Sequence, residues 1–74
     1  MKIIYDPHTD TLTVILADGV KVHESEEKKE GIILDYDAQG NLIGVEILHA
    51  SKRMLSVRKI EFEMMPIVEE GPAR

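Results

Sequence analysis

Apolar residues in this chain recur mostly at every second position, and this period constrains the fold more than any other feature of the sequence. A period of two is typical of β-strands, whose successive side chains point to opposite faces of a sheet. Clusters of Gly, Pro, Asp and Asn separate the alternating runs, as expected for turns between strands. The pattern predicts an α+β fold dominated by β-structure: a small antiparallel sheet of hairpins with one short helix near residues 49–55.

Two hairpins account for most of the predicted sheet. Their strands are expected at residues 2–5, 11–16, 32–36 and 41–48. The hairpins match one another, because Tyr5-Asp6 in the first corresponds to Tyr36-Asp37 in the second, and Asp10 corresponds to Asn41. An Asp at the start of a turn accepts backbone N–H bonds, so any hairpin benefits from this residue. The likeness therefore has two explanations, an internal duplication or the shared requirements of short turns.

Two different structures are predicted for the segment between the hairpins, an edge strand followed by a loop. Val20–Glu24 alternates, and its polar neighbours indicate an edge strand. Glu26–Glu30 is charged throughout, and we interpret it as a solvated loop, with one turn of helix as the alternative.

The C-terminal third changes character twice. After the short helix, Ile60, Phe62 and Met64 alternate with charged residues from Val57 onward, which predicts a strand with one wet face, ending at Pro66. An extension of the helix through residues 55–65 is the alternative. We expect residues 1–68 to form a single small domain and residues 69–74 to fray.

The chain contains 14 acidic and 9 basic residues, so its formal net charge is -5. Such a chain repels phosphate backbones and anionic lipids, and we expect no binding to nucleic acid or to membranes. The absence of cysteine removes disulfides and fits a cytoplasmic location. A domain this small buries only about 60% of its unfolded surface, so we expect it to gain stability as a homodimer.

The alternation divides the predicted sheet into two faces. The larger apolar set is expected to form the core and comprises Tyr5, Leu12, Val14, Leu16, Ile32, Leu34, Tyr36, Ile43, Val45 and Ile47. A second set lies out of phase and comprises Ile4, Ile15, Ile33, Leu42 and Leu48. One short helix cannot cover this second face, so we predict that it forms the homodimer contact.

The richest cluster of chemically active side chains is Asp6, His8 and Asp10 in the first turn. Oxygen-rich turns can bind divalent cations, but the two Asp residues also form turns, and we expect a structural role. The pair His23-Glu24 and the residue His49 are interpreted as surface groups. The sequence predicts no catalytic, cofactor-binding or metal-binding residues and no cofactor. A small metal-dependent or acid–base enzyme that uses Asp6, His8 and Asp10 is the alternative.

A longer pattern covers most of the chain. It comprises Tyr5-Asp6, Asp10, Leu12, Gly31 through Asp37, Gly40, Gly44 through Leu48, and Ala50 through Met54. In order and spacing it resembles the short prokaryotic family called domain of unknown function twenty-two eighty-three. The resemblance implies an antiparallel sheet followed by a short helix, and no established activity. For some relatives it implies membership of toxin–antitoxin-like pairs. The chain departs from that family after Met54, where an extended segment replaces a longer helix.

We therefore predict an interaction or structural module rather than an enzyme. It is expected to homodimerise, and an antitoxin-like role with a protein partner is a specific form of this prediction.

Overall fold

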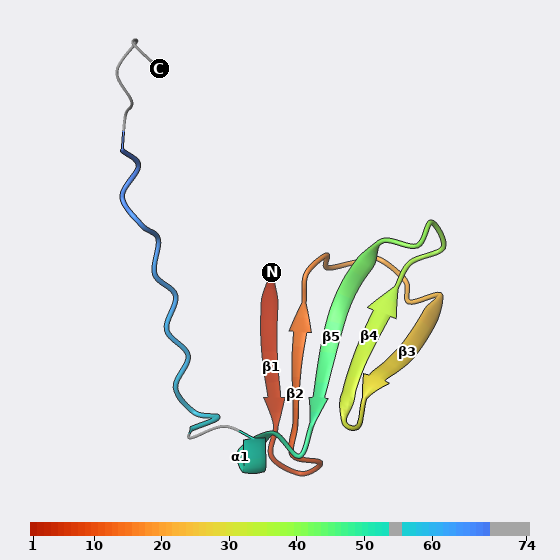
Figure 1. The fold of residues 1–74 in the computed structure, drawn as a ribbon, viewed down its shortest axis with the longest axis horizontal. Helices are drawn as coiled ribbons and strands as arrows, with labels where there is room; N and C mark the ends of the chain where they lie inside the picture. Colours follow the sequence, from red (N-terminus) through yellow and green to blue (C-terminus); the bar gives the residue numbers. More distant parts are fainter. Residues whose placement is uncertain (54–55, 69–74) are drawn as a thin grey trace.

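In the computed structural model, which describes residues 1–53 and 56–68, the chain forms a five-stranded antiparallel sheet followed by a short helix (Figure 1). The elements are β1 (Lys2–Asp6), β2 (Thr11–Ile15), β3 (Glu24–Lys29), β4 (Ile32–Tyr36), β5 (Leu42–Leu48) and α1 (Ala50–Arg53). The strands lie in the order β1-β2-β5-β4-β3. The predicted β-dominated class is confirmed. No helix in the described part of the chain is long and apolar enough to cross a membrane.

The two matching turns use their Asp residues in the same way. Asp6 Oδ1 accepts a hydrogen bond from His8 N at 2.9 Å, and Asp37 Oδ1 accepts one from Gln39 N at 3.0 Å. Each carboxylate thus satisfies the amide two residues later, the geometry of an Asx turn. The likeness between the hairpins therefore extends from sequence to turn geometry.

Strand β3 occupies the segment that we interpreted as a solvated loop. The prediction of an edge strand at Val20–Glu24 and a loop at Glu26–Glu30 was wrong. In the structure, residues 16–23 connect β2 to β3 without a strand, and β3 pairs with β4. All residues of β3 are exposed, so backbone pairing rather than burial holds this strand. A charged strand at a sheet edge has no apolar period to reveal it.

The sheet is a single layer, and its larger apolar face is open. The strand registers place ten apolar side chains on this face, which we call the first face: Ile3, Tyr5, Leu12, Val14, Ile32, Leu34, Tyr36, Leu42, Val45 and Ile47. Among these only Leu12 is buried. The helix α1 lies at one end of the strands rather than over the face (Figure 1). The predicted core set is therefore mostly half-exposed.

One irregularity moves an apolar side chain to the opposite face, the second face. Asp35 pairs with Gly44, but the next residue, Tyr36, pairs with Leu42, so β5 contains an extra residue at Ile43. Ile43 is buried and shares a pocket with side chains of the second face, among them Thr13. We predicted Ile43 on the first face, and this was wrong because a strict alternation does not register an inserted residue.

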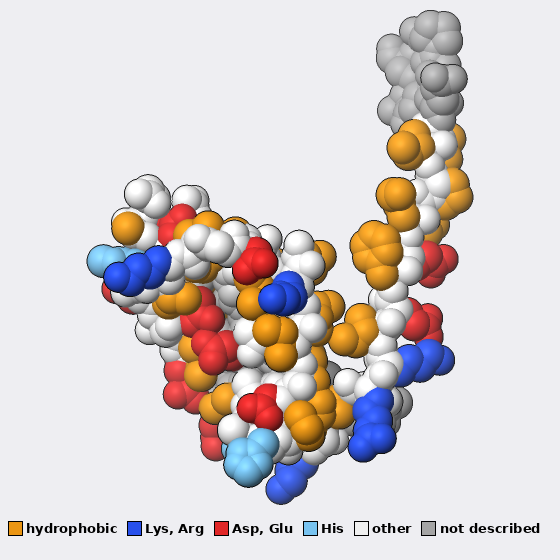
Figure 2. All heavy atoms as spheres, turned by 180° about the vertical axis from the view of Figure 1, so that it is seen from behind, with side chains coloured by type: hydrophobic (Ala, Val, Ile, Leu, Met, Phe, Trp, Pro, Cys, Tyr) orange, Lys and Arg blue, Asp and Glu red, His pale blue; other side chains and the backbone are white. Residues whose placement is uncertain are grey.

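Residues 56–68 form no strand, in contrast to the prediction for Val57 onward. The segment projects away from the sheet in an extended course (Figures 1 and 2). A strand requires a neighbour for its backbone groups, and none of the strands in residues 1–53 lies beside this segment. The predicted helix near residues 49–55 is found at Ala50–Arg53. Its expected last two residues and the expected fraying of residues 69–74 lie outside the described residues.

Candidate functional site

The first turn uses its three candidate side chains separately. Asp6 accepts the backbone N–H of His8, whereas Asp10 points to other elements. His8 is exposed. Within residues 1–53 and 56–68, no three His, Asp or Glu side chains come close enough together to hold a metal ion.

Asp10 joins the first hairpin to the helix. Its Oδ1 accepts hydrogen bonds from Tyr5 Oη at 2.7 Å and from Ser51 N at 3.0 Å, and its Oδ2 accepts one from Ser51 Oγ at 2.7 Å. The backbone carbonyl of Asp10 accepts a further bond from Ala50 N at 2.9 Å. The bonds from Tyr5 and Ser51 hold the pKa of Asp10 below its usual value, and the bond to Asp10 raises the pKa of Tyr5.

Arg53 fastens the other end of α1 to the sheet. Its Nε donates to the carbonyl of Leu48 at 3.0 Å, and its Nη2 donates to the carbonyl of Glu30. The guanidinium fits because Gly31 has no Cβ: a Cβ there would collide with Arg53. Gly31 also has a φ of 81°, which non-glycine residues adopt only with strain. The helix thus bridges the β1–β2 turn and the β3–β4 turn.

The second face carries a cluster of carboxyl groups that sequence reasoning missed. Asp35 is only 6% exposed and accepts a hydrogen bond from Ser25 Oγ at 2.6 Å. Its carboxylate lies over Gly44, where a Cβ would come 3.3 Å from Asp35 Oδ2. A hydrogen bond to Asp35, together with partial burial and the charge of Asp35, raises the pKa of Glu46. The carboxylate of Asp35 therefore opposes the ionisation of Glu46.

Two hollows lie on opposite faces of the sheet. A hollow of about 220 Å³ is lined by the connection between β2 and β3 and by residues of the second face, including Asp35 and Ile43. A second hollow of about 370 Å³ is lined in part by Glu24, Glu26 and Tyr36, which the strand registers place on the first face. His23 and Glu24, expected as surface groups, are exposed and line this second hollow.

Comparison with protein-family models places the sheet and the start of the helix in a known family. The model of the family described as "Protein of unknown function (DUF2283)" matches residues 2–51, which is more than half of the chain. This chain belongs to the DUF2283 family. Neither the curated proteins nor the solved structures contain a match.

The DUF2283 match spans the complete sheet and the start of α1, and it includes both partners of the Asp10–Ser51 contact. The projecting segment lies beyond it. The common part of the fold is therefore the sheet with its first helix contact, and residues 56–68 are outside the matched region.

The positions of Asp35 and Glu46 in the sequence indicate the carboxyl cluster, although the period of the apolar residues does not. Asp35 interrupts an apolar run, and Glu46 lies between two β-branched residues. If the polar residues of β4 and β5 had been assigned to faces in the same way as the apolar ones, Asp35 and Glu46 would have fallen on the same face. The contact with Ser25 was not predictable, because β3 itself was not recognised.

Proposed function

We propose that this chain is a protein–protein interaction module that homodimerises through the first face of its sheet. The observation that carries the proposal is the open state of this face, where ten apolar side chains from four strands form a continuous surface and only Leu12 is buried. Contiguous apolar surfaces of this kind mark interaction sites in small proteins. Each such side chain contributes roughly 1.5–3 kcal/mol when it is fully buried, so pairing two copies would supply much of the stability that a single layer lacks.

The second face, where the sequence analysis placed the homodimer contact, is less suited to self-association. Asp35 and Glu46 lie near its centre, and two copies pressed together there would desolvate four carboxyl groups of like charge. Burying charges without opposite partners costs several kcal/mol. This cost supports the first face as the contact surface.

An antitoxin-like partner is the second occupant that we consider for the first face. The net charge of -5 would steer a basic partner toward the chain. The lack of cysteine fits action in a reducing cytoplasm. The enzyme alternative gains no support from Asp6, His8 and Asp10, since the two carboxylates hydrogen-bond to different elements.

Two neighbouring positions of β4 test the proposal. Leu34 lies on the first face opposite Glu26, and Ile33 lies on the second face opposite Glu46. A lysine at either position therefore meets a cross-strand carboxylate, so Ile33→Lys is a matched control for Leu34→Lys. We expect sedimentation equilibrium at micromolar concentration to give a dimer for the unmodified chain and for Ile33→Lys, and a folded monomer for Leu34→Lys. An unmodified chain that sediments as a single 8.4 kDa species would contradict homodimerisation and leave the first face to a different protein.

A further inference from the structure

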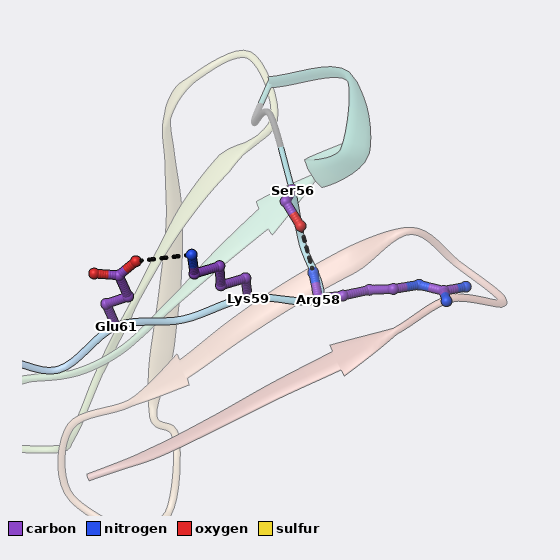
Figure 3. A network of polar contacts seen from close by, with 4 residues as sticks. All are labelled: Ser56, Arg58, Lys59 and Glu61. Atoms are coloured by element: carbon purple, nitrogen blue, oxygen red, sulfur yellow. Dashed lines mark hydrogen bonds and ion pairs between the residues drawn. The ribbon is translucent and has the colours of Figure 1, made fainter.

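Residues 57–65 have the pattern of a strand, and the described part of the chain places no strand beside them. Lys59 Nζ and Glu61 Oε1 lie 3.2 Å apart (Figure 3), so these two side chains project to the same side, as positions i and i+2 of an extended chain do. Phe62 is 83% exposed and Ile60 is 54% exposed. In Figure 2 the acidic side chains lie along one side of the lower part of the segment with hydrophobic side chains on the opposite side, and hydrophobic side chains lie on both sides further up.

The segment also makes the chain unusually extended. The radius of gyration is 16.2 Å, against about 11 Å for a compact chain of this length. A free apolar segment of this kind is an aggregation hazard unless a partner covers it.

The edge of the sheet at β1 offers a matching template. Among the described residues β1 pairs with β2 alone, so its outer backbone donors and acceptors have no ladder partner there. The strand has no bulge in its register and no proline, and its central residues Ile3 and Ile4 are exposed. An apolar edge strand that has neither a bulge nor a proline favours the addition of another strand.

The opposite edge of the sheet is a poor template for the same segment. β3 is exposed along its whole length, and Glu24 and Glu26 occupy its first-face positions. If residues 59–63 paired there with their apolar side chains on the first face, these side chains would lie beside the carboxylates of Glu24 and Glu26. A register shifted by one residue would place Glu61 and Glu63 beside the same carboxylates. Like charges directly opposite each other destabilise a strand pair.

One antiparallel register satisfies both the faces and the charges at β1. Its pairs are Lys59–Asp6, Ile60–Tyr5, Glu61–Ile4, Phe62–Ile3 and Glu63–Lys2. It extends the first face with apolar side chains and creates two pairs of opposite charge. A shift by one residue would place Lys59 and Glu61 on the apolar face, and a shift by two leaves at most one pair of opposite charge.

We propose that residues 59–63 add to β1 of a second copy as a sixth strand in this register, so that each copy donates one strand and receives one. The inference rests on the proposed homodimer and specifies how its chains are joined. The second copy is the occupant because the segment stands off its own sheet, and because a reciprocal exchange closes with two-fold symmetry, the commonest form of homodimer.

Cysteine pairs test the register directly, because the chain has no cysteine of its own. Directly opposed residues have Cβ atoms about 4.5–5.5 Å apart, within reach of a disulfide after small adjustments. Ile3→Cys and a mass-tagged Phe62→Cys are prepared as separate full-length chains, mixed and oxidised with glutathione disulfide. Ile4→Cys mixed with Phe62→Cys is the matched control, since position 4 lies on the opposite face.

We expect the first mixture to form a disulfide between an Ile3→Cys chain and a Phe62→Cys chain, and the control mixture to form several-fold less. A chain that carries both substitutions and closes a disulfide within itself, while the mixture gives none, would overturn the exchange in favour of pairing with its own β1. Sedimentation of the unoxidised chain separates the two proposals. A dimer that gives no cross-link in the mixture would overturn only the strand exchange, whereas a monomer would overturn the homodimer as well.

Charge reversal tests the same register without cysteine substitutions, through the dimer dissociation constant. We expect Lys2→Glu and Glu63→Lys each to raise the dimer dissociation constant by about threefold or more, and the double variant to restore it, because cross-strand charge pairs act locally. Two single effects that simply add in the double variant would overturn the proposed register.

Discussion

The Ser51 hydroxyl donates to Asp10 Oδ2 at 2.7 Å, which connects two residues 41 positions apart. Because Ser51 belongs to α1 and Asp10 to the first turn, this contact fixes the end of β5 against the β1–β2 hairpin. The same carboxylate accepts the Tyr5 hydroxyl, so a side chain of the first face is held by the same group.

Replacing Asp10 tests how much this connection contributes. Asp10 has a φ of 56°, a conformation that Asn tolerates better than Ala. We expect Asp10→Ala to lower the melting temperature by several degrees, Asp10→Asn to lower it less, and Ser51→Ala to lower it least, because Ser51→Ala retains the bonds to Tyr5 Oη and to the backbone N–H of residue 51. Thermal unfolding followed by circular dichroism measures the three variants. Equal losses for Asp10→Asn and Asp10→Ala would show that the backbone conformation contributes nothing.

The same residue predicts a pH dependence. The folded pKa of Asp10 lies below its ordinary value of 3.8, so the ionised carboxylate stabilises the fold above that value. This contribution is lost as the pH falls through the lowered folded pKa. We expect the difference in stability between the unmodified chain and Asp10→Asn to shrink between about pH 7 and pH 3, as measured by urea unfolding. A difference that stays constant over this range would contradict the role of the charge.

Glu46 predicts the opposite trend. Its pKa is raised from the ordinary value of 4.5, so the folded chain loses stability as the pH rises through that value and Glu46 ionises beside Asp35. Glu46→Gln keeps a donor for Asp35 without the charge. We expect this variant to be more stable than the unmodified chain at neutral pH, by at most about 1 kcal/mol because solvent screens a partly exposed pair. The advantage should vanish near pH 4, and a variant that is less stable at neutral pH would rule out this account.

Two glycines with nearly the same backbone conformation separate strain from collision. Gly19 has a φ of 79° with open space around its missing Cβ, whereas Gly31 has a φ of 81° with Arg53 in that position. We expect Gly19→Ala to cost about 1–2 kcal/mol from the left-handed backbone alone. Gly31→Ala should cost more, because it also displaces the guanidinium from the carbonyls of Leu48 and Glu30. Chemical denaturation compares them, and equal costs would mean that the Arg53 contacts contribute nothing.

Metal titration tests the structural role of the first turn. Because Asp6 and Asp10 are engaged in hydrogen bonds to different elements, we expect calorimetry with Zn²⁺, Mn²⁺ and Mg²⁺ to show no stoichiometric binding. Tight binding that His8→Ala abolishes would require both carboxylates to leave these bonds and act together, and would favour the enzyme alternative.

The sequence identified the strands whose side chains alternate between an apolar and a polar environment. Leu12 and Val14 on β2 and Val45 and Ile47 on β5 show this period, and the structure pairs them on one face. β3 escaped detection because its pairing depends on backbone hydrogen bonds at an edge, where charged side chains carry no period. Conversely, Ile60 and Phe62 show the period without forming a strand, since alternation indicates a suitable surface and not the presence of a neighbour.

The polar sites were less predictable than the strands. The Asx turns at Asp6 and Asp37 follow from residue type and position. The contacts of Asp10 with Ser51 and of Arg53 with Glu30 depend on where a four-residue helix docks. Local propensities do not determine this docking. The extra residue at Ile43 is likewise invisible to a period of two, and it changes which side chains share a face.

The connection over residues 16–23 divides the sheet into two pieces that are each built from sequence neighbours: the β1–β2 hairpin and the β3–β4–β5 meander. They are joined by one ladder, in which Thr11 pairs with Leu48 and Ile15 with Gly44. Hairpins close quickly, whereas ladders between distant residues form slowly, so we expect the docking of β2 on β5 to govern the folding rate. A chain cut within this connection would present the same ladder as a contact between two separate polypeptides, and the two fragments would reassemble the sheet by complementation.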